Sequence, residues 1–82
     1  MPSSFRSGRH KRLAELLEQY RREADMKQAD VAKMLGRHQP LITNMENGQR
    51  RIDVIELLEL AEIIGFNPHD VLDELLKVPK DD

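Results

Sequence analysis

The side chains best suited to a chemical task are carboxamides on one short predicted helix, residues 39–46. Ile42 and Met45 lie three positions apart and form the inner face of this helix, so its other sides have no need to be buried. Those sides carry four polar residues: Gln39, Thr43, Asn44 and Asn47. Gln and Asn can each form two hydrogen bonds to an adenine base, a discrimination worth roughly 1 to 3 kcal/mol per pair. The pattern therefore predicts a helix that reads base edges in the major groove of DNA.

A second short helix and a sharp turn must hold this reading helix in place. Residues 28–35 have helical periodicity, with Ala32 and Leu35 three positions apart on one face. Gly36 follows, and glycine is the residue best suited to a chain reversal over residues 36–38. Residues 28–48 therefore predict two short helices joined by a turn.

Two longer helices are predicted to supply most of the core. The first spans about residues 9–24 and carries an apolar stripe at helical spacing: Leu13, Leu16, Leu17 and Tyr20. The other begins at Asp53, whose carboxylate suits an N-cap, and Glu56 three residues later completes a capping-box pattern. Its predicted apolar face has five members: Val54, Leu57, Leu58, Ala61 and Ile64. We expect Gly65 to end this helix and Phe66 to join the core.

A last helix is predicted over residues 68–76, with Asn67 as its cap and Pro68 in its first turn. Its apolar surface is broader than the interior of a small monomer needs: Val71, Leu72, Leu75 and Leu76. Part of that surface predicts a two-fold interface between two copies of the chain. The candidate interface residues are Ile63, Val71, Leu75 and Val78. The alternative, that this surface only closes the core, stays open.

Composition places the chain among small globular proteins with an uneven charge. Its 82 residues allow one domain, and they contain no cysteine and no apolar run of membrane-spanning length or signal-peptide type. We therefore expect a soluble, cytoplasmic protein with no membrane partner. Residues 1–51 hold 11 Lys and Arg against 6 acids, a net +5, whereas residues 52–82 hold 2 against 9, a net −7. This asymmetry favours a molecule that orients on a polyanion through its N-terminal half, although simple clustering on a solvated surface is the alternative.

The chain ends are predicted to lie outside the folded domain. We divide the chain into a flexible arm over residues 1–8, a domain over residues 9–78 and an acidic tail over residues 79–82. Four basic residues lie in or just after the arm: Arg6, Arg9, Lys11 and Arg12. They form either an arm over a DNA backbone or a solubilising tail, and both readings stay open.

The residue patterns of enzymes and metal sites are missing from the sequence. No nucleophile with a base, no paired acids and no phosphate-binding glycine loop can be recognised. His10, His38 and His69 are far apart and lack the spacing of zinc ligands. We therefore predict no enzymatic activity, no metal and no cofactor.

Beyond these patterns, one ordered set of residues extends along most of the chain: Arg21, Gln28, Ala32, Leu35, Gly36, Gln39, Ile42, Glu46, Asn47, Gly48, Leu57, Leu60, Ala61 and Gly65. With this set at this spacing, the chain from about Arg12 to Leu76 resembles the Cro and phage-repressor (Xre-like) helix-turn-helix family. The resemblance implies an all-α fold, a five-helix lambda-repressor-like DNA-binding domain with its helix-turn-helix formed by helices 2 and 3. It also implies an ion pair between Arg21 and Glu46 that ties the scaffold to the reading helix.

The resemblance further implies that base contacts come from the first, second and sixth residues of the reading helix: Gln39, Pro40 and Asn44. Because Pro40 offers no hydrogen-bond group, we expect an apolar contact to a thymine methyl from either Pro40 or Leu41. Phosphate contacts would come from the helix-turn-helix and the loop after it: Lys27, Gln28, Arg37, His38, Thr43, Asn47, Arg50 and Arg51. The sequence departs from the family at Asp25, Lys27, His38 and Pro40, where glycine, hydroxyl caps and a polar reader are usual.

These patterns and the resemblance together predict a transcriptional regulator, by family resemblance a repressor, that binds double-stranded DNA in a sequence-specific manner as a homodimer on an inverted repeat. Two copies would place their reading helices in successive major grooves, about 34 Å apart. The alternative is a protein-interaction module, antitoxin-like or an adaptor, whose acidic C-terminal half docks a basic protein partner.

Overall fold

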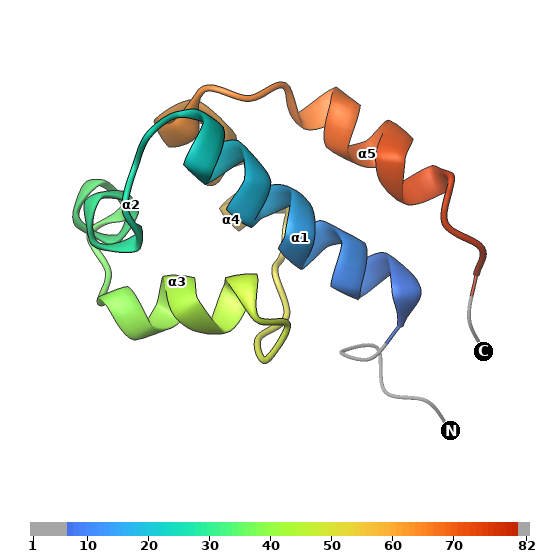
Figure 1. Ribbon diagram of the computed structural model, residues 1–82, viewed down its shortest axis with the longest axis horizontal. Helices are drawn as coiled ribbons and strands as arrows, with labels where there is room; N and C mark the ends of the chain where they lie inside the picture. The colour runs from blue at the N-terminus through green and yellow to red at the C-terminus, as the bar shows by residue number, and fades with distance from the viewer. Residues whose placement is uncertain (1–6, 81–82) are drawn as a thin grey trace.

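Five helices make up the part of the chain that the computed structural model describes, residues 7–80. They are α1 (Gly8–Glu23), α2 (Gln28–Leu35), α3 (Gln39–Glu46), α4 (Val54–Ile64) and α5 (Pro68–Leu76). Between residues 7 and 80 there is no strand, so the all-α prediction is confirmed. α1 runs through the middle of the molecule, and α3 and α5 lie on opposite sides of it (Figure 1).

The core forms where α1 meets the shorter helices. Leu13, Leu16 and Leu17 are buried as the stripe on α1 predicted, and they pack with apolar residues of the other four helices: Val31, Ala32, Ile42, Met45, Leu57, Leu60 and Val71. Tyr20, one turn further along α1, is half-buried and stacks on Phe66 with 4.7 Å between ring centroids. This stack connects the end of α1 to the loop between α4 and α5.

Local side-chain caps fix three of the helix starts. The Asp53 carboxylate accepts from the Glu56 amide at 2.7 Å, and the Glu56 carboxylate accepts from the Asp53 amide at 3.1 Å, so the predicted capping box is present. Asn67 accepts from the His69 amide at the start of α5. Such caps satisfy amide hydrogens that have no partner within the helix. Ser7 caps α1 in the same way by accepting from the His10 amide. Each cap lies within three residues of its partner, so the starts of these helices can be predicted from the local sequence.

The predicted arm is corrected by the start of α1. Ser7 caps this helix and Gly8 is its first residue, so the folded part begins before residue 9. Arg9 donates to the Val78 carbonyl at 3.1 Å, and Arg12 forms an ion pair with Glu74. Arg6 lies outside the described residues. The two arginines thus join α1 to the end of α5. The arm over a DNA backbone and the solubilising tail both stay predictions.

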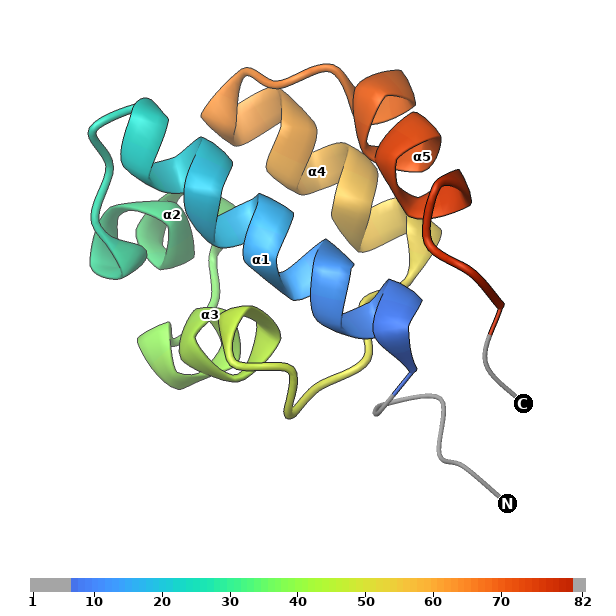
Figure 2. The same ribbon diagram turned by 45° about the vertical axis from the view of Figure 1, so that its right-hand side comes forward.

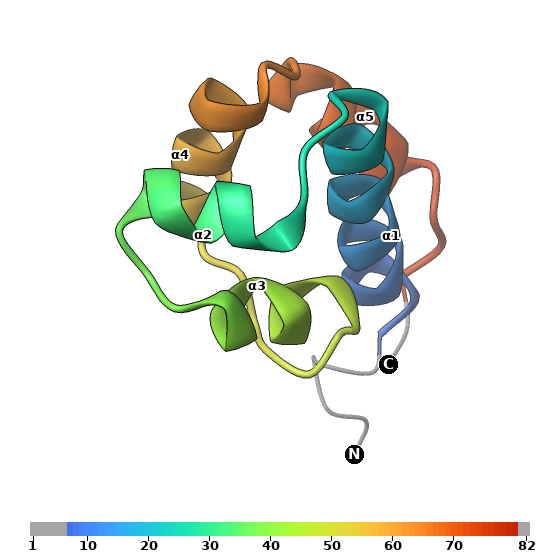
Figure 3. The ribbon, with the colours of Figure 1, turned by 60° about the vertical axis from the view of Figure 1, so that its left-hand side comes forward.

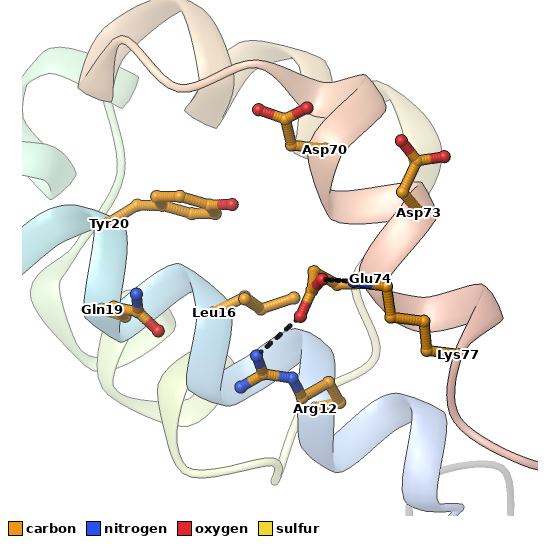
Figure 4. Close-up of a pocket in the computed structure, with 8 residues that line it drawn as sticks. All are labelled: Arg12, Leu16, Gln19, Tyr20, Asp70, Asp73, Glu74 and Lys77. Carbon is orange, nitrogen blue, oxygen red and sulfur yellow. Dashed lines mark hydrogen bonds and ion pairs between the residues drawn. The ribbon is translucent and has the colours of Figure 1, made fainter.

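Figure 4 shows the groove between α1 and α5, which Arg12 crosses to reach Glu74 at 3.0 Å. Lys77 binds the other oxygen of the same carboxylate at 2.6 Å. These hydrogen bonds, from Lys77 first and then Arg12, lower the pKa of Glu74. The groove is therefore braced by an ionic cluster within the protein.

The apolar face predicted for α4 is partly wrong. Leu57 and Ala61 are buried, but Val54 is 68% exposed and Leu58 is 44% exposed, and Leu60 takes a core position instead. The reason is the placement of α5, which packs chiefly on α1 and only lightly on α4. One side of α4 is consequently left open.

Candidate nucleic-acid interface

The segment from α2 to α3 forms the predicted pair of short helices. Gly36 ends α2 with a φ of +73°, in the left-handed region that glycine adopts most easily, and the Arg37 amide donates back to the Ala32 carbonyl at 2.9 Å. α3 then begins at Gln39 and lies at the edge of the molecule, beside α2 (Figure 3). This arrangement leaves one long side of α3 facing away from the protein.

The inner side of α3 is held firmly by the core. Ile42 and Met45 are almost completely buried, with exposed fractions of 2% and 1%. Leu41 is half-buried and packs against the same core. The sequence did not indicate this packing, because Leu41 flanks the inner stripe of Ile42 and Met45. Its contact with a thymine methyl stays a prediction.

The outer side of α3 carries the predicted readers. Gln39, Pro40 and Asn44 are all exposed. The carboxamides of Gln39 and Asn44 have no hydrogen-bond partner among residues 7–80, so their donors and acceptors face solvent. Pro40 occupies the second position of α3, where the missing amide hydrogen costs no helical bond. The outer face can therefore offer two carboxamides and one apolar ring to a ligand.

An almost buried ion pair anchors α3 to α1. Arg21 donates from Nε to one Glu46 oxygen at 2.6 Å and from Nη2 to the other at 3.0 Å. The exposed fractions of the two side chains are 9% and 6%. Arg21 also donates to the Met26 carbonyl at 2.8 Å, which ties down the loop before α2. The ion pair that the family resemblance implied is thus present, and it fixes the end of α3 on the scaffold.

Two predicted phosphate ligands take part in the same network. The Gln28 amide donates to Glu46 at 2.9 Å, and its carbonyl oxygen accepts from the Thr43 hydroxyl at 2.7 Å. Both side chains are half-buried. Gln28 and Thr43 thus connect α2 to α3 within the protein. Sequence spacing gave no sign of this, because Gln28 and Glu46 lie eighteen residues apart.

The remaining helix-turn-helix candidates border the outer face of α3. Lys27, Arg37 and His38 are exposed, and neither Lys27 nor His38 caps its helix through its side chain. Asp30 compensates at α2 by accepting from the Lys27 amide at 2.9 Å. The Asn47 oxygen accepts from the Gln49 amide at 3.1 Å, and Asn47 itself is exposed at the end of α3.

The loop between α3 and α4 carries two predicted phosphate ligands, Arg50 and Arg51. Arg50 binds both oxygens of Glu56, at 2.9 and 2.6 Å, so one predicted phosphate clamp is already paired within the protein. These hydrogen bonds lower the pKa of Glu56, assisted by the Asp53 amide. Arg51 is exposed. Glu56 was predicted only as a capping residue, and its second role as a partner of Arg50 was missed.

One of the four predicted interface residues is fully buried, and the other three are half-buried. Val71 is completely buried, so its assignment to a dimer interface is wrong. Ile63 and Leu75 are half-buried and pack against the core, and Val78 is half-buried. The exposed apolar side chains of α4 and α5 are instead five others, which we call the α4–α5 apolar face: Val54, Ile55, Leu58, Leu72 and Leu76.

Among residues 7–80, no cluster of three or more His, Asp or Glu side chains is arranged to hold a metal ion. None of the five helices combines the length and the apolar character required to cross a lipid bilayer.

Comparison with known proteins places this geometry in a family. The sequence model of a helix-turn-helix domain matches residues 12–75. An XRE-family like protein from Pseudomonas syringae pv. tomato str. DC3000 is 36% identical, and the match covers 84% of each chain with a TM-score of 0.77. No curated protein is similar enough in sequence to count as a match.

Two more distant structures share the fold. The clp gene regulator ClgR from C. glutamicum is 17% identical, over 84% of this chain and 90% of that one, with a TM-score of 0.76. The restriction-modification controller protein C.AhdI from Aeromonas hydrophila is 22% identical, over 73% and 91%, with a TM-score of 0.68. The matched residues 12–75 include the α2–turn–α3 segment and its anchor on α1. The chain therefore belongs to the Xre-like helix-turn-helix family.

Proposed function

We propose that this protein is a transcriptional regulator that binds double-stranded DNA in a sequence-specific manner through α3. The observation that carries the proposal is the outer face of α3, where Gln39 and Asn44 present carboxamides with no partner among the described residues. Carboxamides of this kind match the donor and acceptor edges of adenine in the major groove. Burial of Ile42 and Met45 supports the same assignment, since it holds the reading side chains on a rigid helix.

The phosphate contacts are proposed to surround this face. Lys27 and Arg37 supply exposed cations near the two ends of α2, and His38, Asn47 and Arg51 supply further donors along α3 and its following loop. Cations and amides beside a reading helix fix its register on the duplex without reading sequence. Arg50 is left out of this set because it is already bound to Glu56.

The protein is proposed to act as a homodimer on an inverted repeat. The support is the α4–α5 apolar face, because a small monomer rarely exposes five large apolar side chains on two neighbouring helices. Pairing through this face on a two-fold axis would leave α3 of each copy free, since α3 and α5 lie on opposite sides of α1 (Figure 2). Closed two-fold pairing is also the commonest form of soluble oligomer.

The relatives support a regulatory role. The structural neighbours include a clp gene regulator and a restriction-modification controller protein, although both are below 25% identity and share only the fold. The relative from Pseudomonas syringae, at 36% identity, carries the XRE family name. A role as repressor, activity without any catalytic step and residence in the cytoplasm are part of the same proposal.

A titration of duplex DNA at several salt concentrations tests the proposal. Phosphate contacts predict a steep fall in affinity with rising salt, and base contacts predict that a selected duplex binds more tightly than a random one. Gln39→Ala and Asn44→Ala should reduce this preference, whereas Arg37→Ala should weaken all duplexes alike. Absence of binding to every duplex at low salt would overturn the proposal.

The protein-interaction module is the second candidate. It is favoured by the acidic residues of α4 and α5 that flank the exposed leucines, since Glu59, Glu62 and Asp73 have no hydrogen bond or ion pair among residues 7–80. Such a face would suit a partner with a basic and apolar surface. Sedimentation of the purified protein distinguishes the two uses of this face: a stable dimer assigns it to self-association, and a monomer leaves it open for a different protein.

A further inference from the structure

We propose that Thr43 is a specificity-determining residue that presents only a hydrogen-bond acceptor and a methyl group to DNA. The polarity of its hydroxyl is fixed by a relay of four side chains: Arg21, Glu46, Gln28 and Thr43. This inference rests on the proposed DNA-binding function and assigns one further reading position to it. It replaces the phosphate contact predicted for Thr43 from the sequence.

The first step fixes the orientation of Gln28. Arg21 donates to both oxygens of Glu46, so the Glu46 side chain acts as an acceptor at each of its two oxygens. Whatever Gln28 places beside the Glu46 Oε1 atom must therefore be a donor, and only its amino nitrogen is one. The Gln28 Nε2 atom lies 2.9 Å from that oxygen. The carbonyl oxygen of Gln28 must then point the other way.

The second step fixes the hydroxyl of Thr43. The Gln28 carbonyl oxygen lies 2.7 Å from Thr43 Oγ1 and has no hydrogen to give, so the hydroxyl has to donate its single hydrogen. The other polar atom near this hydroxyl is the Gln39 carbonyl at 3.4 Å, which is also an acceptor. Both neighbours within the protein compete for the hydrogen. Only oxygen lone pairs remain for an external partner.

The third step concerns where Thr43 lies on α3. Ile42 and Met45 define the buried side, and at 3.6 residues per turn Thr43 falls on the outer half, one turn from Gln39 and one turn from Asn47. It is half-buried, and its hydroxyl lies 3.4 Å from the backbone carbonyl of Gln39, one of the proposed readers. Its position therefore borders the surface that enters the groove.

An acceptor at this position selects among partners. Phosphate oxygens accept hydrogen bonds and donate none, so a Thr43 hydroxyl whose hydrogen is used by Gln28 cannot bind them. In the major groove the donors are the amino groups of adenine and cytosine, whereas guanine and the thymine carbonyl offer acceptors. Thr43 should therefore favour a base with an exocyclic amino group at one position of each half-site.

The experiment compares Thr43→Val, which keeps the shape and removes the hydroxyl, with Thr43→Ser, which keeps the hydroxyl. Bound sequences are selected from a random duplex pool for each protein, and affinities are then measured on duplexes that differ at the affected base pair. One neutral hydrogen bond predicts that Thr43→Val loses about 3- to 10-fold of discrimination at one base pair per half-site. Thr43→Ser should keep that preference. Melting curves verify that both variants fold.

The outcomes separate this inference from the proposed function. If Thr43→Val weakens all duplexes equally, or leaves every preference unchanged, Thr43 is no base reader and the inference is overturned while DNA binding stands. If the wild type binds no duplex, both proposals fall. An NMR experiment on the free protein checks the relay itself: the Thr43 hydroxyl proton should be protected from exchange with water and should lose that protection in Gln28→Leu. A rapidly exchanging proton in the wild type would contradict the relay.

Discussion

Removal of the Glu46 carboxylate should cost more stability than any surface charge change in this protein. Glu46→Ala leaves the Arg21 guanidinium buried without its counter-ion, since the two side chains are almost completely enclosed. Breaking such a pair costs about 3 to 5 kcal/mol when the remaining charge stays buried. A chain of this size has a total unfolding free energy of only about 4 to 12 kcal/mol. The variant should therefore lose about a quarter or more of its stability.

Urea denaturation followed by circular dichroism measures this loss, and α1 provides a matched control. Arg22 pairs with Glu18 at 2.8 Å, but their side chains are 70% and 40% exposed, so Arg22→Ala should cost less than about 1 kcal/mol. The double variant Arg21→Met/Glu46→Leu should recover much of the loss, because it buries no unpaired charge. If Glu46→Ala costs no more than Arg22→Ala, the reasoning about this anchor is refuted.

Three further predictions test other parts of the structure. The Arg50 hydrogen bonds lower the pKa of Glu56 below its ordinary 4.5. The pair therefore contributes its full stability above that pH and loses it as the pH falls through the lowered pKa of the folded state. Glu56→Gln should flatten this loss of stability at acid pH in a pH series of melting temperatures. Val71→Ala should cost about 2 kcal/mol in denaturation because Val71 is fully buried, and Leu72→Ala should stay within about 0.5 kcal/mol in the monomer; equal costs would contradict the core assignment. Leu72→Asp should convert a dimer to a monomer in sedimentation without loss of helix content, and an unchanged dimer would exclude this part of the α4–α5 apolar face from the interface.

The helices were predictable because their boundary signals are local. Gly36 with its left-handed conformation, the reciprocal cap of Asp53 and Glu56, and Pro68 in the first turn of α5 each act within a few residues. Such signals do not depend on the rest of the fold. The bounds of α2, α3 and α5 accordingly agree with the sequence prediction.

Burial on α4 and α5 was not predictable in the same way. Helical periodicity shows which residues share a face, but it cannot tell which neighbour covers that face. Val71 and Leu72 are adjacent apolar residues on α5, yet one is fully buried and the other is 49% exposed. The difference arises because α5 packs on α1 rather than evenly on α1 and α4.

In the candidate site, too, the features set by local sequence could be predicted and those set by tertiary packing could not. The exposed positions of Gln39 and Asn44 follow from the helical periodicity of residues 39–46, which can be read from the sequence. The partners of Gln28 and Arg50 do not, because long polar side chains choose among several acceptors brought close only by the fold. Whether such a side chain meets DNA or another residue is therefore decided by tertiary packing.

The central claim is that the outer face of α3 is the surface that meets DNA. The most direct measurement is an NMR titration of the protein with a selected duplex, in which the backbone and side-chain amide signals of each residue are followed. The account predicts the largest shifts at the carboxamides of Gln39 and Asn44, with smaller ones at Lys27 and Arg37 and almost none along the outer side of α5. Shifts confined to α4 and α5, with the α3 carboxamides unchanged, would contradict it.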